Sequence, residues 1–266
     1  MRNVLVIATN TTREIVRQPA FLLVLVLGAA ALLLGRYMTL FALGEEVSMF
    51  KDIGTSTILL VGLLIVVFAS TTTIHEEIEN RTILTLLSRP VSRAQLLLGK
   101  YLGLAAAVAA AFVLLLGVFL VAHWWMLHYE YNFADKTEPF VSPQIVKAVY
   151  LAFLQVLLLG GVAMVASIYL ALLPNMALCG LVFVAGHLSD YVFAVFRDPE
   201  TLRMHPLARF FYLLIPDLEH FNVSSALVTG TTIPGGYLTL ATLYTLVYLT
   251  ALLTAGVLLF NRRELL

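Results

Sequence analysis

The sequence predicts an all-α polytopic membrane protein with six transmembrane helices. Of its 266 residues, 61% are hydrophobic and only 12% are charged, whereas soluble domains typically carry about 25% charged residues. Several apolar segments reach the roughly 20 residues that a helix needs to cross a ~30 Å hydrocarbon core. These segments are apolar on nearly all sides, as lipid-surrounded helices must be. The predicted spans are 20–42, 53–74, 99–126, 145–172, 176–196 and 237–260.

Composition also excludes some function classes. The formal net charge is zero, so nothing in the overall charge favours binding to nucleic acid. The single cysteine, Cys179, lies in an apolar segment and cannot form an internal disulfide. We expect no cleavable signal peptide, because polar residues occupy the start of the chain where such a signal has its apolar core.

Residues 1–19 are too polar to span a membrane. Apolar side chains recur among them while Arg13 and Arg17, one helical turn apart, can face water. This pattern predicts an amphipathic helix lying at the membrane interface, ended by Pro19. A loose N-terminal tail is the alternative.

The distribution of basic residues predicts that both termini are cytoplasmic. Basic residues concentrate before the first span, between the second and third, and after the sixth, whereas those on the other side are spread over longer segments. The clustered ones are Arg2, Arg13, Arg17, Arg81, Arg89, Arg93, Lys100, Arg262 and Arg263. This orientation makes "LLPN" (172–175) a tight cytoplasmic connection, and it makes 127–144 and 197–236 outer segments. In 197–236 we expect one or two short helices that either dip into the outer leaflet or cap the bundle.

The connector between the second and third spans, 75–92, has the marks of a helix with defined ends. Acidic residues cluster where the positive end of a helix dipole favours them, and Glu77 and Arg81 are spaced to pair. Pro90 ends this helix at about residue 88. Ser92 and Gln95 then predict a capping box that starts the next helix. Many surface loops are helical and charged, so the pattern alone also fits an ordinary connector.

The stretch "EIENRTILTLLSRPVSRAQLLLGKYLG" (77–103) resembles the loop between the second and third spans of ABC-2-type ABC transporter permeases. The matching residues are Glu77, Glu79, Thr82, Leu86, Leu87, Pro90, Val91, Ser92, Arg93, Gly99 and Lys100. Arg81 departs from the glycine that the family often has. Weaker similarity lies in Glu14 with Arg17, in "YLLIPDLEHFNV" (212–223) and in "FNRRELL" (260–266). Within the family the chain resembles the branch that includes the permease for copper-enzyme maturation.

The resemblance implies a permease subunit, not itself an enzyme, of an ATP-driven exporter in a bacterial or archaeal cytoplasmic membrane. A separate ABC ATPase would bind ATP and magnesium, since this chain has no GxxxxGK[ST] phosphate loop. A second permease chain, identical or not, and membrane lipid complete the expected partners. The connector would be the coupling helix that the ATPase moves. The residues that the resemblance assigns to it are Glu77, Glu79, Arg81, Thr82, Leu86, Leu87, Arg89, Pro90 and Ser92.

Ionisable residues within a span are functional candidates, because burying them is costly. His187 and Asp190 lie three residues apart in the fifth predicted span, so they share a helix face. They are either a proton- or cargo-sensing pair or an ordinary interhelical pair. Gln155, Ser167 and Tyr169 are expected to bond neighbouring helices. Scattered His and Met residues without tight spacing do not predict a metal site.

Two other function classes stay open at this point. The same fold could pass ATPase motion to an extracytoplasmic protein without moving a solute, using 127–144 and 197–236 as a docking surface. An intramembrane enzyme would need a convergent polar site, for which His187 and Asp190 are the only candidates.

Overall fold

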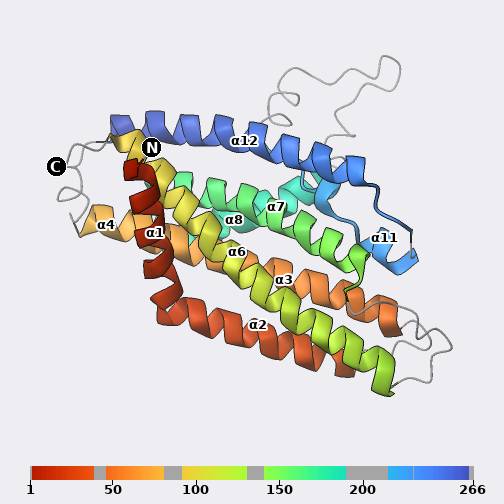
Figure 1. The fold of residues 1–266 in the computed structure, drawn as a ribbon. Coiled ribbons are helices and arrows are strands. Elements are labelled where there is room, and N and C mark those ends of the chain that lie inside the picture. The colour runs from red at the N-terminus through yellow and green to blue at the C-terminus, as the bar shows by residue number, and fades with distance from the viewer. Residues whose placement is uncertain are drawn as a thin grey trace, which may run out of the picture.

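The computed structural model describes residues 2–38, 46–80, 92–130, 141–189, 215–229 and 231–263. Within these ranges the chain forms helices and no strands, and the long helices lie side by side in one bundle (Figure 1). The long apolar helices are α2 (Pro19–Met38), α3 (Glu46–Ser70), α6 (Arg93–Trp125), α7 (Pro143–Ala166) and α12 (Gly235–Arg262). The all-α polytopic fold is therefore confirmed.

Five helices of the described chain are long and apolar enough to cross a membrane. The second of them runs from Glu46 to Glu79 over 34 residues, because α3 continues through the π-helix η2 (Thr71–His75) into α4 (Glu76–Glu79). The fifth predicted span, 176–196, corresponds to α8 (Leu172–His187), whose 16 residues cover about 24 Å, less than a hydrocarbon core. Its predicted end lies outside the described residues.

The predicted connection "LLPN" is wrong by a few residues. Helix α7 ends at Ala166 and α8 begins at Leu172, so residues 167–171 make the connection and "LLPN" forms the first turn of α8. Pro174 fits there because the first backbone N–H groups of a helix have no partner within the helix.

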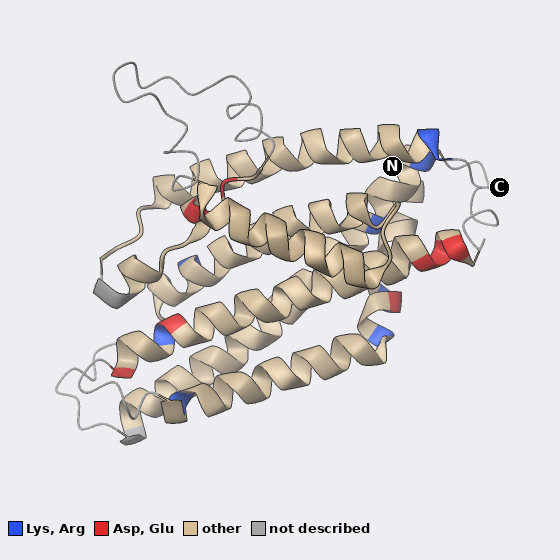
Figure 2. Ribbon diagram, turned by 180° about the vertical axis from the view of Figure 1, so that it is seen from behind, with Lys and Arg blue, Asp and Glu red and all other residues tan. Residues whose placement is uncertain are grey.

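Helix α1 (Arg2–Arg17) lies crosswise to the spans at one end of the bundle (Figure 1). It buries Ala8, Thr11 and Ile15 and keeps its arginines outward. The described ends of the chain and α4 lie at this same end, which we call the terminal end. Figure 2 shows charged residues gathered at the terminal end and at the opposite end, with a belt between them that is almost free of charge. This distribution suits a bundle that crosses a bilayer.

The centre of the bundle is α7, which has the largest buried share of the candidate spans, whereas α2 and α12 have the smallest. At the opposite end, a 3₁₀ turn (Glu219–Phe221) and α11 (Ser224–Thr229) fold over the bundle. Leu218 and Phe221 are buried there against leucines of α7. The π-helix η3 (Met126–Glu130) directly follows α6 and extends it at this end.

Candidate functional site

Three consecutive threonines in η2 each contact a different part of the terminal end. Thr71 Oγ1 accepts a hydrogen bond from Asn175 Nδ2 of α8 at 3.0 Å. Thr72 Oγ1 lies 3.2 Å from Nε2 of Gln18, which stands between α1 and α2. The Thr73 carbonyl accepts from Lys100 Nζ of α6 at 2.6 Å. The π-helix therefore joins α3 to α8, to α6 and to the junction between α1 and α2.

The sequence around η2 favours a break in regular α-helix. The hydroxyls of Ser70, Thr71 and Thr72 bond back to carbonyls three or four residues earlier, at 2.9–3.2 Å, and such bonds bend helices. Glu76 N–H donates to the Thr71 carbonyl, five residues back. Single π turns within α-helices are rare and occur frequently at functional sites.

A buried ion pair links the two helices that flank the 81–91 connection. Lys100 Nζ lies 2.6 Å from Glu77 Oε2, and the exposed fractions of the two side chains are 2% and 18%. Glu14 of α1 is close enough to interact electrostatically with both charges. Because a buried ammonium needs a counter-charge and hydrogen bonds, Glu77 and the Thr73 carbonyl together hold Lys100 in place.

The acidic residues do not begin a helix, contrary to the sequence-based expectation. Glu76, Glu77 and Glu79 lie at the C-terminal end of the 34-residue helix, which stops at Glu79. The dipole at that end disfavours negative charge. Glu77 is compensated by Lys100, and Glu79, which is exposed, lies 3.7 Å from His75 Nε2. The apolar pattern ends at residue 74, but residues 63–79 contain no glycine or proline that would stop the helix, so the helix extends to Glu79.

The start of α6 is capped as predicted. The Ser92 side chain accepts from Gln95 N–H at 3.2 Å, and Ser92 N–H donates to Gln95 Oε1 at 3.3 Å. The next residue, Arg93, donates from Nη1 to the carbonyls of Phe260, Asn261 and Arg263 at 2.6, 3.4 and 3.1 Å. Phe260 and Asn261 belong to the last turn of α12 and Arg263 directly follows it, so these carbonyls have no acceptor role within the helix. The N-terminus of α6 thus holds the C-terminus of α12.

Two glycines let α1 lie directly on α6. A Cβ added at Gly103 would stand 2.6 Å from Thr11 Cβ and 2.7 Å from the Ala8 carbonyl oxygen, and one at Gly99 would stand 2.8 Å from Ile7 Cβ. Thr12 Oγ1 donates to the Gly103 carbonyl at 3.0 Å. Because the nearest neighbours include backbone, no larger residue fits without moving α1.

We predict that Gly103→Ala destabilises the protein by about 1–3 kcal/mol, the usual cost of overpacking a tight contact. The matched control is Gly117→Ala in the same helix, where an added Cβ meets nothing within 4 Å. Unfolding by sodium dodecyl sulfate measures both variants. Equal stability of the two variants would contradict the close α1–α6 contact.

Three of the nine predicted coupling residues flank the 81–91 connection. Glu77 points inward to Lys100, Glu79 faces outward, and Ser92 caps α6. The remaining predicted residues lie outside the described part of the chain. They are Arg81, Thr82, Leu86, Leu87, Arg89 and Pro90.

His187, at the end of α8, belongs to a different region. Its Nδ1 lies 2.9 Å from the Phe183 carbonyl and its Nε2 lies 3.2 Å from Gln155 Nε2 of α7. With Nδ1 donating to the carbonyl, Nε2 accepts from the amide of Gln155. These two side chains line a cavity of about 270 Å³ with Thr55 and Ser56 of α3. Asp190 lies outside the described residues, so the predicted pair stays a prediction.

The other interhelical predictions have mixed outcomes. Gln155 bonds α8 as expected, and Tyr169 OH donates to the Leu259 carbonyl of α12 at 3.1 Å. Ser167 instead donates to the Met164 carbonyl of its own helix. In the described chain, no three His, Cys, Asp or Glu side chains gather as a metal site.

Sequence reasoning missed several residues of the terminal end. Thr71, Thr72, Thr73, Gln18 and Asn175 drew no attention, although an unbroken threonine triplet at the end of a span is an available signal. Lys100 and Arg93 were noticed only as members of the basic cluster and as motif matches. A lysine inside an otherwise apolar helix indicates a buried counter-charge.

Comparisons with known proteins agree with this architecture. The family model described as ABC-2 family transporter protein matches residues 5–265. A search of curated proteins finds no match. The family match includes α1, the connection between α4 and α6, and the end of α12.

Proposed function

Because the chain belongs to the ABC-2 family of transporter proteins and is thus a multi-pass permease subunit of an ABC transporter, we propose that it works as an exporter driven through the 75–92 region. A separate ATPase subunit would bind ATP and magnesium and would press on this region. The terminal end would face the cytoplasm of a bacterial or archaeal cell.

The observation that carries the proposal is the way in which the connection is fixed at its two ends. The preceding helix is joined to α6 by the Glu77–Lys100 pair, and α6 begins at the Ser92 capping box. A push on residues between them therefore reaches both helices at once. Packed elements that have two arrangements transmit such motion as rigid bodies.

Neighbouring contacts would extend the motion beyond these two helices. Helix α1 lies on α6 through Gly99 and Gly103, and Arg93 holds the end of α12. We propose that α1 gives the ATPase a second contact. Two permease chains and two ATPases would form the working unit, since closure of an ATPase pair must act on a pair of membrane subunits.

Capture of the partner tests the proposal. We predict that the chain, tagged after Leu266 and extracted in mild detergent, retains a soluble ABC ATPase. Leu86→Asp should lower the retained ATPase at least tenfold and abolish stimulation of ATP hydrolysis, because a carboxylate disrupts an apolar contact. Asn222→Asp, exposed at the opposite end, is the matched control and should leave both unchanged.

Unchanged ATPase retention and unchanged ATP hydrolysis in Leu86→Asp would overturn the assignment of the connection as the coupling contact. Absence of any ATPase, both in the native extract and after mixing with a candidate ATPase, would overturn the broader proposal. Membrane insertion of each variant is checked by its yield in the detergent extract.

Transmission of force to an extracytoplasmic protein is the second candidate function. The folded cap formed by the 3₁₀ turn and α11 supports it, because Leu218 and Phe221 anchor that cap to α7. An outer protein that co-purifies with the complex would favour force transmission. ATP-dependent efflux of a defined solute from vesicles would favour export.

A further inference from the structure

A second cavity lies at the opposite end, between α12 and the segment that leads into the 3₁₀ turn. Its volume is about 530 Å³, within the usual range for small-molecule sites of about 300–1,000 Å³. Aromatic side chains form much of its wall. They are Phe221, Tyr237, Tyr244 and Tyr248.

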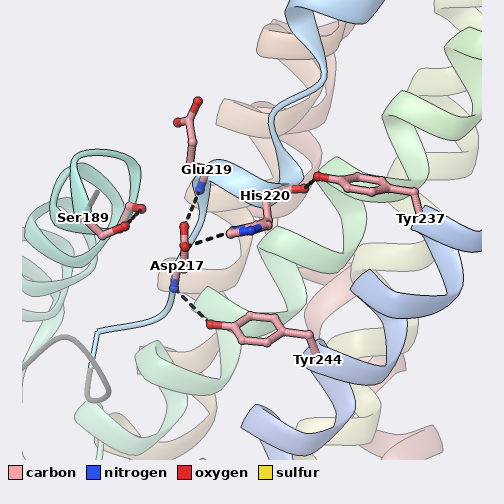
Figure 3. Close-up of polar contacts among 7 residues, drawn as sticks. Ser189, Asp217, Glu219, His220, Tyr237 and Tyr244 are labelled. Carbon is pink, nitrogen blue, oxygen red and sulfur yellow. Dashed lines mark hydrogen bonds and ion pairs between the residues drawn. The ribbon is translucent and has the colours of Figure 1, made fainter. Parts of the chain in front are cut away.

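The three tyrosines are held as a wall by their own contacts. They are spaced seven and four residues apart, so they share one face of α12. Tyr237 OH donates to the His220 carbonyl, and Tyr244 OH accepts from Asp217 N–H at 3.0 Å. Figure 3 shows both rings reaching from α12 to the 217–220 segment. The Tyr244 ring centroid lies 6.1 Å from those of Phe221 and Tyr248.

The polar rim of this cavity is acidic. Asp217 Oδ2 lies 2.9 Å from His220 Nδ1, and Asp217 Oδ1 accepts from Glu219 N–H at 3.1 Å. Glu219 itself is exposed beside them. No lysine or arginine is among the described residues that line the cavity. An anionic ligand would therefore meet the Asp217 carboxylate, and His220 is the only basic side chain among the described residues of the cavity wall.

The cavity is also close to the lipid-facing surface. Helix α12 is among the least buried candidate spans, and Leu240 and Tyr244, which line the cavity, are 67% and 38% exposed. A molecule with an apolar body can thus reach the cavity from the part of the bilayer that surrounds this end of the bundle.

We propose that this cavity binds a lipophilic cation, with the apolar body against the tyrosine wall and the positive charge near Asp217. Aromatic faces attract cations, and rings grouped around a cavity are how proteins hold ammonium ligands. The Asp217 carboxylate supplies charge complementarity, and the bilayer supplies the route. The inference concerns binding alone and holds whichever protein drives the permease.

Two ions of the same shape and opposite charge test the proposal. The purified full-length chain in non-ionic detergent is dialysed to equilibrium against tritiated tetraphenylphosphonium, and separately against tetraphenylborate. We expect saturable binding of one tetraphenylphosphonium per chain and at least tenfold weaker binding of tetraphenylborate. Equal binding of the two ions would overturn the proposal, and this comparison needs no variant.

Variants locate the site. Asp217→Asn keeps an oxygen that can accept the hydrogen bond from Glu219 N–H but removes the negative charge. Tyr248→Leu removes one aromatic ring from the wall. Each variant should weaken tetraphenylphosphonium binding at least fivefold. Tyr37→Leu is the control, because Tyr37 is exposed on α2 away from this cavity. Unchanged binding in both cavity variants would overturn the location. Thermal unfolding without the probe identifies a variant that has lost its fold, in which case the other variant decides.

Discussion

Replacing Glu77 with glutamine is expected to destabilise the protein by about 3–5 kcal/mol, the usual cost of removing one partner of a buried ion pair. Glutamine keeps the shape of the side chain but removes the negative charge that lies 2.6 Å from the Lys100 ammonium, whose side chain is 2% exposed. The Thr73 carbonyl would still accept a hydrogen bond but cannot neutralise the charge. Unfolding by sodium dodecyl sulfate measures the loss.

A double-variant cycle separates the pair from the general cost of each change. Lys100→Met should cost less than Glu77→Gln, because Glu77 is 18% exposed and water can partly solvate it. Combining Glu77→Gln with Lys100→Met should recover most of the stability, since neither buried charge remains. Additive losses in the double variant would show that the two side chains do not interact.

The same double variant also tests the role of the pair in coupling. If the pair joins α4 to α6 mechanically, the stable double variant should bind the ATPase normally yet stimulate it less. If the pair contributes only stability, stimulation should return together with stability. The two results assign the pair either to force transmission or to folding.

The helical bundle and the capping box of α6 could be predicted from the sequence, because both depend on local features. Apolar length identified the spans, and Ser92 with Gln95 identified the start of α6, since a capping box is formed by residues three positions apart. The amphipathic pattern of 1–19 likewise predicted α1. The sequence did not predict that the helix beginning at Glu46 ends at Glu79, because residues 75–79 can continue a helix as readily as they can begin one.

The contacts of the terminal end could not be predicted from the sequence, because they join residues that are distant in the chain. Lys100 needs Glu77 on another helix, and Asn175 needs Thr71. Gly103 lies in an alanine-rich stretch, and no pattern along the chain indicates that Thr11 and Ala8 of α1 are the residues that pack against it. Each of these roles follows from how the helices pack, which the pattern along one helix does not determine.

Helix α6 is the common partner at the terminal end. Its first turn begins at the Ser92 capping box, and Arg93 donates hydrogen bonds to the end of α12. Helix α1 packs on Gly99 and Gly103, and Lys100 forms an ion pair with Glu77. A displacement of the N-terminus of α6 cannot occur without straining all of these contacts. The start of α6 is therefore the point at which a force on the preceding connection would spread through the bundle.

Replacing Arg93 with methionine tests this view of α6. The guanidinium donates to carbonyls at the end of α12 and lies 5.4 Å from the Phe260 ring. A hydrogen bond to a charged group contributes about 1.5–3 kcal/mol, so Arg93→Met should destabilise the protein by about 2–3 kcal/mol. Protease cleavage near residues 260–263 should also become faster, because the last turn of α12 loses its partner.

Arg262→Met is the matched control, since Arg262 is exposed in the same turn and its loss removes an equal charge near the same helix end. That variant should change stability by less than about 1 kcal/mol, the usual range for a charge at a helix terminus. If α12 moves together with α6, Arg93→Met should still retain the ATPase but should stimulate ATP hydrolysis less than the control variant does. Stimulation equal to that of Arg262→Met, despite faster cleavage near residue 260, would show that α12 does not follow α6 in the driven motion.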